Sequence, residues 1–262
     1  MKTLYILVLV LITFSSCQSF YQAGLAGSEY QHLETPFNNT DSTITAHYVK
    51  AGFQQGVEYY KNEKNDIQFV GYHYAVSRKY FGFAVGGNVF HGKYDVTSFV
   101  RDMEHLNKSY DYWGAEALIK FNFNIPVSNW FHWRVIGGQM SWNTERGAFY
   151  DFRDDMAKLD DEMELFSTLA DEMTNISFYL DSELLFNPAS DLFFGLNCAC
   201  GTNVKHMNFS FVASSSIEYK SVGLKCLRKV GTPKLAHVYI SMFDNTVNHE
   251  IDNWQFAVYY KF

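Results

Sequence analysis

The chain of 262 residues is long enough for one large domain, and 18% of its residues are aromatic, including 24 Phe and 18 Tyr. Its formal net charge of −7, without any run of Lys or Arg, argues against a basic nucleic-acid-binding surface, so no nucleic-acid partner is expected. Many aromatic residues together with only 4 prolines favour β-strands, in which aromatic side chains pack well.

The first seventeen residues predict an export signal. Lys2 precedes an apolar run over residues 4–14, which is too short to span a membrane as a helix. Two serines before Cys17 resemble a bacterial lipobox, whose cysteine becomes the acylated first residue of the mature protein. We therefore expect residues 1–17 to be a signal peptide of the lipoprotein type with lipid attachment at Cys17. The alternative is ordinary signal cleavage without acylation.

Residues 18–43 are rich in Gln, Ser, Gly, Asn and Thr and show no hydrophobic periodicity. This composition predicts an N-terminal linker. The remaining residues, 44–262, are predicted to form one β-barrel domain.

From residue 44 onward, apolar and polar side chains alternate with a period of two, which predicts β-strands. Segment 112–125 is the clearest example. The predicted strands are longer than the usual strands of soluble sheets, which have about 5–6 residues. They cover residues 46–60, 66–78, 80–94, 112–125, 130–142, 176–186, 191–201, 216–229, 234–243 and 253–262.

The connections between these strands alternate between short and long. Short connections carry turn residues such as Pro, Asn, Asp and Gly. The longest of the others cover residues 95–111, 143–175 and 202–215. This alternation predicts an all-β fold, an up-and-down antiparallel β-barrel of about ten strands, with both termini of the barrel at the end that carries the short turns.

Two kinds of barrel fit this pattern. A soluble barrel of the lipocalin type would place its apolar residues inside, whereas a membrane barrel places them outside. Strand length, the asymmetry of the connections and aromatic residues near strand ends favour the membrane barrel. The soluble lipocalin-like lipoprotein that binds an apolar ligand stays as an alternative.

The last predicted strand, NWQFAVYYKF, alternates up to Phe262. It resembles the C-terminal signature of Gram-negative outer-membrane β-barrels, and this resemblance implies that Trp254, Tyr260 and Phe262 form a signal read by the outer-membrane assembly machinery. Together with the signal peptide and the aromatic strands, the pattern also resembles small barrel proteins and lipoproteins of Bacteroidota. The resemblance implies an outer-membrane location in contact with lipid.

If the apolar face meets lipid, charged side chains must line the lumen. We expect these charges to pair with one another, because a narrow barrel is filled by side chains and unpaired buried charges are costly. A narrow pore or a small-ligand cavity is the alternative. The residues of the predicted network are Glu116, Lys120, His132, Arg134, Asp181, Glu183 and Lys261.

Residues 151–173 interrupt the strand rhythm with apolar residues at spacings of three and four. This spacing predicts one helix in a long outer loop. Its Met-rich stripe could cap the barrel or bind a protein partner.

No catalytic set, metal site or cofactor motif emerges from the sequence. His73 and Ser77 lie four residues apart on one predicted strand, too far apart for a hydrogen bond. We therefore favour an outer-membrane barrel with a structural, adhesive or transport-linked role over a barrel enzyme such as a lipase or protease.

Overall fold

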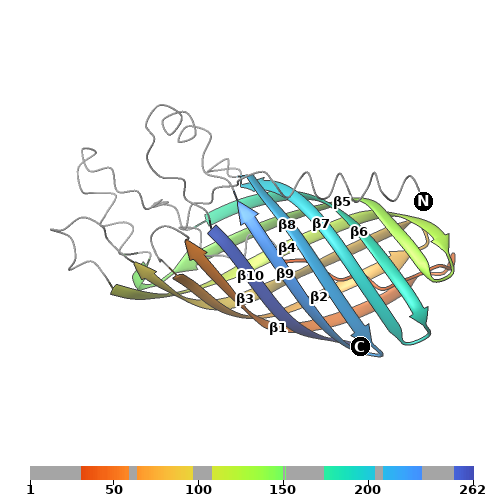
Figure 1. Cartoon of the computed structure of the whole chain (residues 1–262), viewed down its shortest axis with the longest axis horizontal. Helices are drawn as coiled ribbons and strands as arrows, with labels where there is room; N and C mark the ends of the chain where they lie inside the picture. The colour runs from red at the N-terminus through yellow and green to blue at the C-terminus, as the bar shows by residue number, and fades with distance from the viewer. Residues whose placement is uncertain are drawn as a thin grey trace.

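The computed structural model describes residues 31–58, 64–96, 108–149, 151, 174–203, 209–231 and 251–262. Ten strands run antiparallel to their neighbours, and β10 pairs with β1 to close the barrel (Figure 1). The strands are β1 (Ile44–Glu58), β2 (Lys64–Arg78), β3 (Phe81–Val96), β4 (Lys108–Ser128), β5 (Phe131–Arg146), β6 (Thr174–Ala189), β7 (Leu192–Asn203), β8 (Phe209–Tyr219), β9 (Val222–Gly231) and β10 (Ile251–Lys261). The predicted ten-stranded, up-and-down antiparallel barrel is confirmed.

The two ends of the barrel differ in their connections. Turns of two residues join β2 to β3, β4 to β5, β6 to β7 and β8 to β9 at one end, here called the short-turn end. The C-terminus lies there as well, because Phe262 N–H donates to His47 O at 3.0 Å and Lys261 N–H donates to Ser221 O at 2.7 Å (Figure 1). The other end, here called the long-connection end, carries the longer connections.

One predicted strand is wrong. The sequence predicted a long connection over 202–215 and a single strand over 216–229, but β8 begins at Phe209 and a turn at Lys220 separates it from β9. The two residues of this turn, Lys220 and Ser221, include no Gly, Asn, Asp or Pro from which the turn could have been predicted. Lys220 itself adopts the left-handed conformation, with φ of 56°, that a two-residue hairpin turn requires. The predicted strand over 234–243 lies outside the described residues.

The helix predicted for 151–173 lies outside the described residues apart from Asp151. The N–H of this residue donates to Gly147 O at 3.2 Å and closes a single turn after β5. No helix in the described part of the chain is both long and apolar enough to cross a membrane.

The polarity of the barrel is inverted relative to a soluble protein. Large apolar side chains point outward, where Val89 is 62% and Phe123 55% exposed, whereas Lys120 on β4 is fully buried in the interior. A closed barrel with an apolar exterior and a polar interior is suited to lipid rather than water. The alternative of a soluble lipocalin-like barrel is therefore wrong, because its apolar ligand would need an apolar interior.

Candidate functional site

Four of the charged residues predicted for the lumen form two buried ion pairs across the barrel wall. Lys120 Nζ on β4 lies 2.7 Å from Asp181 Oδ2 on β6. Arg134 Nη1 on β5 donates to Glu183 Oε2 on β6 at 2.6 Å. All four residues are more than nine-tenths buried, so the loss of one partner would leave an uncompensated charge inside the barrel.

The other three predicted residues lie in separate contacts. Glu116 accepts a hydrogen bond from Asn88 Nδ2 at 3.1 Å. The ring of His132 is stacked on another aromatic ring and forms no part of these ion pairs. Lys261, near the short-turn end, donates to Glu218. The predicted residues therefore share the lumen, but their contacts are distributed along it.

Residues 31–38, here called the lumen segment, lie inside the barrel and fill its centre. Gln31, His32 and Leu33 are each at most 1% exposed. For these residues the predicted linker over 18–43 has to be corrected, because side chains of the barrel wall bind them on several sides. Residues 18–30 lie outside the described part of the chain.

Glu34 is the charged centre of the lumen segment. Its Oε1 accepts a hydrogen bond from Lys225 Nζ on β9 at 3.2 Å, and its Oε2 lies 3.9 Å from Lys50 Nζ on β1. His73 Nε2 on β2 lies 3.0 Å from the carbonyl oxygen of Glu34 and 3.6 Å from Oε2. One carboxylate of the segment thus meets basic groups from three strands.

The backbone of the lumen segment is held as well. Lys50 Nζ donates to His32 O at 2.8 Å, and Arg134 Nη2 donates to Thr35 O at 2.9 Å. The side chain of His32 reaches the wall in turn, with Nε2 3.3 Å from Glu183 Oε1. Carbonyl groups that would otherwise be buried without a donor are satisfied by wall cations in this way.

The end of the segment nearer to β1 is anchored by packing and a hydrogen bond. The ring of Phe37 stacks on His132 with 4.0 Å between centroids and lies 5.9 Å from the ring of Phe193. Asn38 Nδ2 donates to Ser77 O at 2.9 Å. The segment therefore contacts strands around most of the barrel circumference.

A small cavity of about 40 Å³ remains between the lumen segment and the wall. It has room for roughly three water molecules, whereas pockets for drug-sized ligands measure about 300–1,000 Å³. Its lining includes Glu34, Arg134, Phe193, Glu218 and Tyr259. A cavity of this size does not form a continuous passage.

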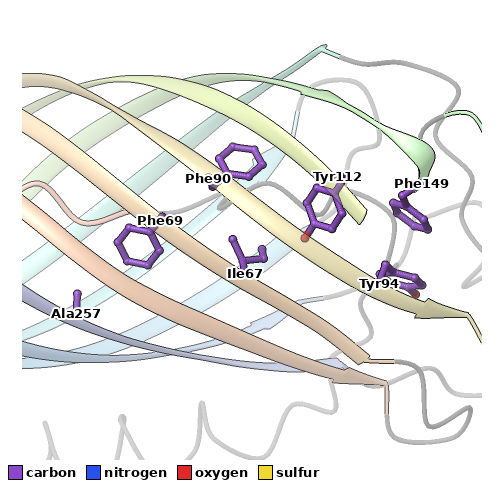
Figure 2. Packing of buried hydrophobic residues seen from close by; sticks show 7 residues of the cluster. All are labelled: Ile67, Phe69, Phe90, Tyr94, Tyr112, Phe149 and Ala257. Carbon is purple, nitrogen blue, oxygen red and sulfur yellow. The ribbon is translucent and has the colours of Figure 1, made fainter. Parts of the chain in front are cut away.

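The lumen near the long-connection end is closed differently. Seven buried residues, here called the aromatic cluster, gather mainly on β2, β3 and β4, and Figure 2 shows Tyr94, Tyr112 and Phe149 next to one another where these strands end. The rings of Tyr94 and Phe149 stack with 4.3 Å between centroids. The members of the aromatic cluster are Ile67, Phe69, Phe90, Tyr94, Tyr112, Phe149 and Ala257.

Glycines in the wall make room for these rings. A Cβ atom on Gly92 would lie 2.0 Å from Tyr112 Cζ, and one on Gly114 would lie 2.3 Å from Phe90 Cζ. A glycine also makes room for one of the ion pairs, because a Cβ on Gly137 would lie 1.7 Å from Asp181 Oδ1. Small and large residues on adjacent strands thus fill the narrow interior together.

The predicted C-terminal signature has the expected geometry. Trp254, Tyr260 and Phe262 all point outward and are between 41% and 61% exposed. The ring of Phe262 stacks on His47 of β1, with 5.6 Å between centroids. The last residue is therefore paired through its backbone and its ring, and its reading by assembly machinery stays a prediction.

His73 and Ser77 are both buried in the lumen, where His73 Nε2 contacts Glu34. Cys17, the predicted lipid attachment site, lies outside the described residues.

No family model matches the chain, and no curated protein matches its sequence. Solved structures similar to it include the β domain of the Bordetella autotransporter Brka, with TM-score 0.46 and 9% identity over 85% of this chain and 100% of that one. The outer membrane protein OprG from Pseudomonas aeruginosa gives 0.37 and 12%, covering 84% and 97%. The outer membrane protease OmpT from Escherichia coli gives 0.36 and 9%, covering 85% and 98%.

These TM-scores lie below 0.5, so the assignment rests on the barrel itself. An even number of antiparallel strands, complete closure, an apolar exterior and short turns at one end are the features of bacterial outer-membrane barrels. This is an outer-membrane β-barrel. Its exterior contacts membrane lipid, and its lumen is the candidate functional site.

Proposed function

We propose that this outer-membrane barrel has a structural or adhesive role and carries no open channel. The observation that supports the proposal is the lumen segment, since residues 31–38 occupy the space that a pore would need. Cations of the wall, among them Lys50, Arg134 and Lys225, hold the segment through its carbonyl groups and Glu34. The aromatic cluster narrows the lumen further towards the long-connection end.

The connections at the long-connection end would carry the adhesive function. Outer-membrane barrels place short turns in the periplasm and longer loops outside. On this orientation, residues 97–107, 147–173 and 232–250 connect strands on the outer side. We propose 151–173, with its Met-rich stripe, as the contact for a protein partner.

Three proposals from the sequence accompany this role. Residues 1–17 would direct export, with acylation at Cys17, and Trp254, Tyr260 and Phe262 would be read by the assembly machinery. The resemblance to small barrel proteins and lipoproteins of Bacteroidota is the third proposal, and it rests on the same pattern. Deletion of Phe262 should lower the amount of barrel in the outer membrane more than truncation of an outer connection does.

A transport-linked role is the second candidate, and one observation favours it. Polar contacts and ring stacking hold the lumen segment, which residues 39–43 join to β1 and which no disulfide fixes within the described residues. A segment held in this way could leave the lumen while it remains tethered to β1, and its departure would open the barrel.

Conductance across a planar lipid bilayer tests whether the lumen segment closes the barrel, which is here called the proposed seal. The full chain should give no steady conductance. Glu34→Lys should give discrete open steps, because a cation at this position repels Lys50 and Lys225. Asn39→Lys is the matched control: it adds the same type of charge to an exposed residue just outside the lumen segment and should stay silent. Steady conductance of the unaltered chain would contradict the seal.

A further inference from the structure

Two buried lysines of the barrel wall depend on the lumen segment for their counter-charge. Lys50 on β1 and Lys225 on β9 are 2% and 6% exposed, and β10 separates their strands. Among the described residues, the only carboxylate within 4 Å of either ammonium group is that of Glu34. The wall thus presents two cations whose balance comes from a separate segment of the chain.

Other wall cations differ in this respect. Lys120 pairs with Asp181, and Arg134 pairs with Glu183, so that both partners belong to the wall. Those pairs would remain complete if the lumen segment left. Lys50 and Lys225 would instead face an unoccupied space as uncompensated buried charges, which is energetically costly.

Three basic groups surround the carboxylate of Glu34, but only one of them donates a hydrogen bond to it. Lys225 donates to Oε1, but Oε2 is buried and has no hydrogen-bond donor. Lys50 Nζ and His73 Nε2 lie 3.9 Å and 3.6 Å from this oxygen, slightly beyond hydrogen-bonding distance. Glu34 also borders the cavity of about 40 Å³. The basic groups therefore surround the carboxylate loosely, with space beside it.

We propose that Lys50, His73 and Lys225 form an anion-binding site of the barrel wall, which takes a carboxylate or phosphate group. Glu34 occupies this site within the same chain, and a free anion competes with Glu34 for it. Two ammonium groups carry N–H donors and no acceptor, and Lys50 uses one of its three donors for His32 O. The remaining donors suit an oxyanion such as a carboxylate or phosphate group. The inference rests on the proposed seal, because competition for this site is what would loosen the lumen segment.

Rescue of a truncated side chain by a free anion tests this site. Glu34→Ala, in the full chain, removes the carboxylate and leaves the space that acetate needs. Sodium acetate at constant ionic strength, with chloride as the reference anion, should raise the unfolding midpoint of this variant by roughly 2–4 °C once its concentration exceeds the dissociation constant about fivefold. Above that concentration the midpoint should continue to rise with the logarithm of the acetate concentration. Inorganic phosphate, measured in the same way, distinguishes a site for phosphate groups from one for carboxylates. The unaltered chain should not be stabilised by acetate in this range, because the tethered carboxylate of Glu34 outcompetes the free anion at these concentrations.

Glu34→Ala combined with Lys225→Met is the matched control, since Lys225 contacts Glu34 and leaves the backbone carbonyls of the segment to other donors. The same rise in midpoint should then require an acetate concentration about tenfold higher, because one charge-assisted hydrogen bond to the anion is lost. If Glu34→Ala does not fold in chloride, its refolding yield into detergent becomes the readout, and acetate should restore the yield.

An equal response of the unaltered chain, Glu34→Ala and the control to acetate and phosphate would overturn the site, and so would the absence of any response in Glu34→Ala. The bilayer recordings separate this result from the proposed function. If the unaltered chain does not conduct and acetate fails to stabilise Glu34→Ala, the proposed closure of the lumen stands and the anion site is wrong. If the unaltered chain conducts but acetate stabilises Glu34→Ala, the anion site stands and the proposed closure of the lumen is wrong.

Discussion

The two halves of the lumen are closed by different physical means. In the aromatic cluster, rings from neighbouring strands such as β3 and β4 pack over glycines of the same wall. Around the lumen segment, contacts join residues far apart in the chain, and Lys225 meets Glu34 across 191 positions. The first arrangement can form as soon as adjacent hairpins pair. The second requires a closed barrel with the segment already inside.

Closure of the wall and occupation of the lumen are therefore separable. Packing in the aromatic cluster belongs to the wall and needs no charged partner. The charges around the lumen segment are specific, because each buried ion needs its own partner. Substitutions in the two regions should therefore differ in size and in how they are rescued.

The largest effect is expected where one member of a buried ion pair is neutralised. Asp181→Asn leaves Lys120 without its carboxylate and should lower the free energy of unfolding by about 3–5 kcal/mol. Urea unfolding in detergent micelles, followed by tryptophan fluorescence, measures the change. The double variant Lys120→Met, Asp181→Leu should recover most of the loss, and a double variant as unstable as the single one would contradict the account.

A somewhat smaller effect is expected in the aromatic cluster. Phe90→Ala removes a buried ring that contacts Tyr112 edge to face, and should cost about 3 kcal/mol in the same unfolding assay. Phe90→Leu preserves most of the volume and should cost about 1 kcal/mol. Similar values for both variants would show that the cluster is not closely packed.

A wall glycine under a ring tests packing in the opposite direction. Gly92→Ala places a Cβ atom against Tyr112 and should cost about 2 kcal/mol through overpacking. Tyr112→Leu in the same chain provides space and should reduce the penalty of the added methyl group. A penalty that is independent of residue 112 would mean that the strain arises elsewhere.

The smallest effect is expected on the exterior. Val89 points outward into lipid, so Val89→Leu should change the free energy of unfolding by less than about 0.5 kcal/mol. A loss of several kcal/mol would indicate that another protein surface covers this face.

The alternation of apolar and polar side chains was sufficient to predict strands and a barrel of about ten of them, because a period of two is a local property of the chain. Which face lies outside was predicted from strand length, the asymmetry of the connections and the aromatic residues near strand ends, since alternation alone fits both orientations. The β8–β9 turn could not be predicted, since Lys220 adopts a positive φ without any residue type that signals it. The charged residues of the wall were predicted for the same local reason as the strands.

The lumen segment could not be predicted, because its signal is not local. Residues 31–38 have no periodicity, and their burial depends on the positions of Lys50, Arg134 and Lys225 on three different strands. The one indication of a buried segment is a count of the charges that face the lumen. Once the register of each strand is known, Lys50 and Lys225 lack a carboxylate partner on the wall. That indication requires the topology first.

Accessibility of nitroxide spin labels along β4 tests directly whether the exterior of the barrel faces lipid while its lumen is filled. Single cysteines at positions 117 to 123, in a chain whose native cysteines are replaced, would carry the label in lipid bilayers. Labels at the outward residues Ile119, Phe121 and Phe123 should collide with lipid-soluble oxygen, whereas those at Leu118 and Asn122 should be shielded from both oxygen and a water-soluble nickel complex. Access of the nickel complex to positions 118 and 122 would show an open, water-filled lumen, and its access to 119, 121 and 123 would show that the exterior does not face lipid.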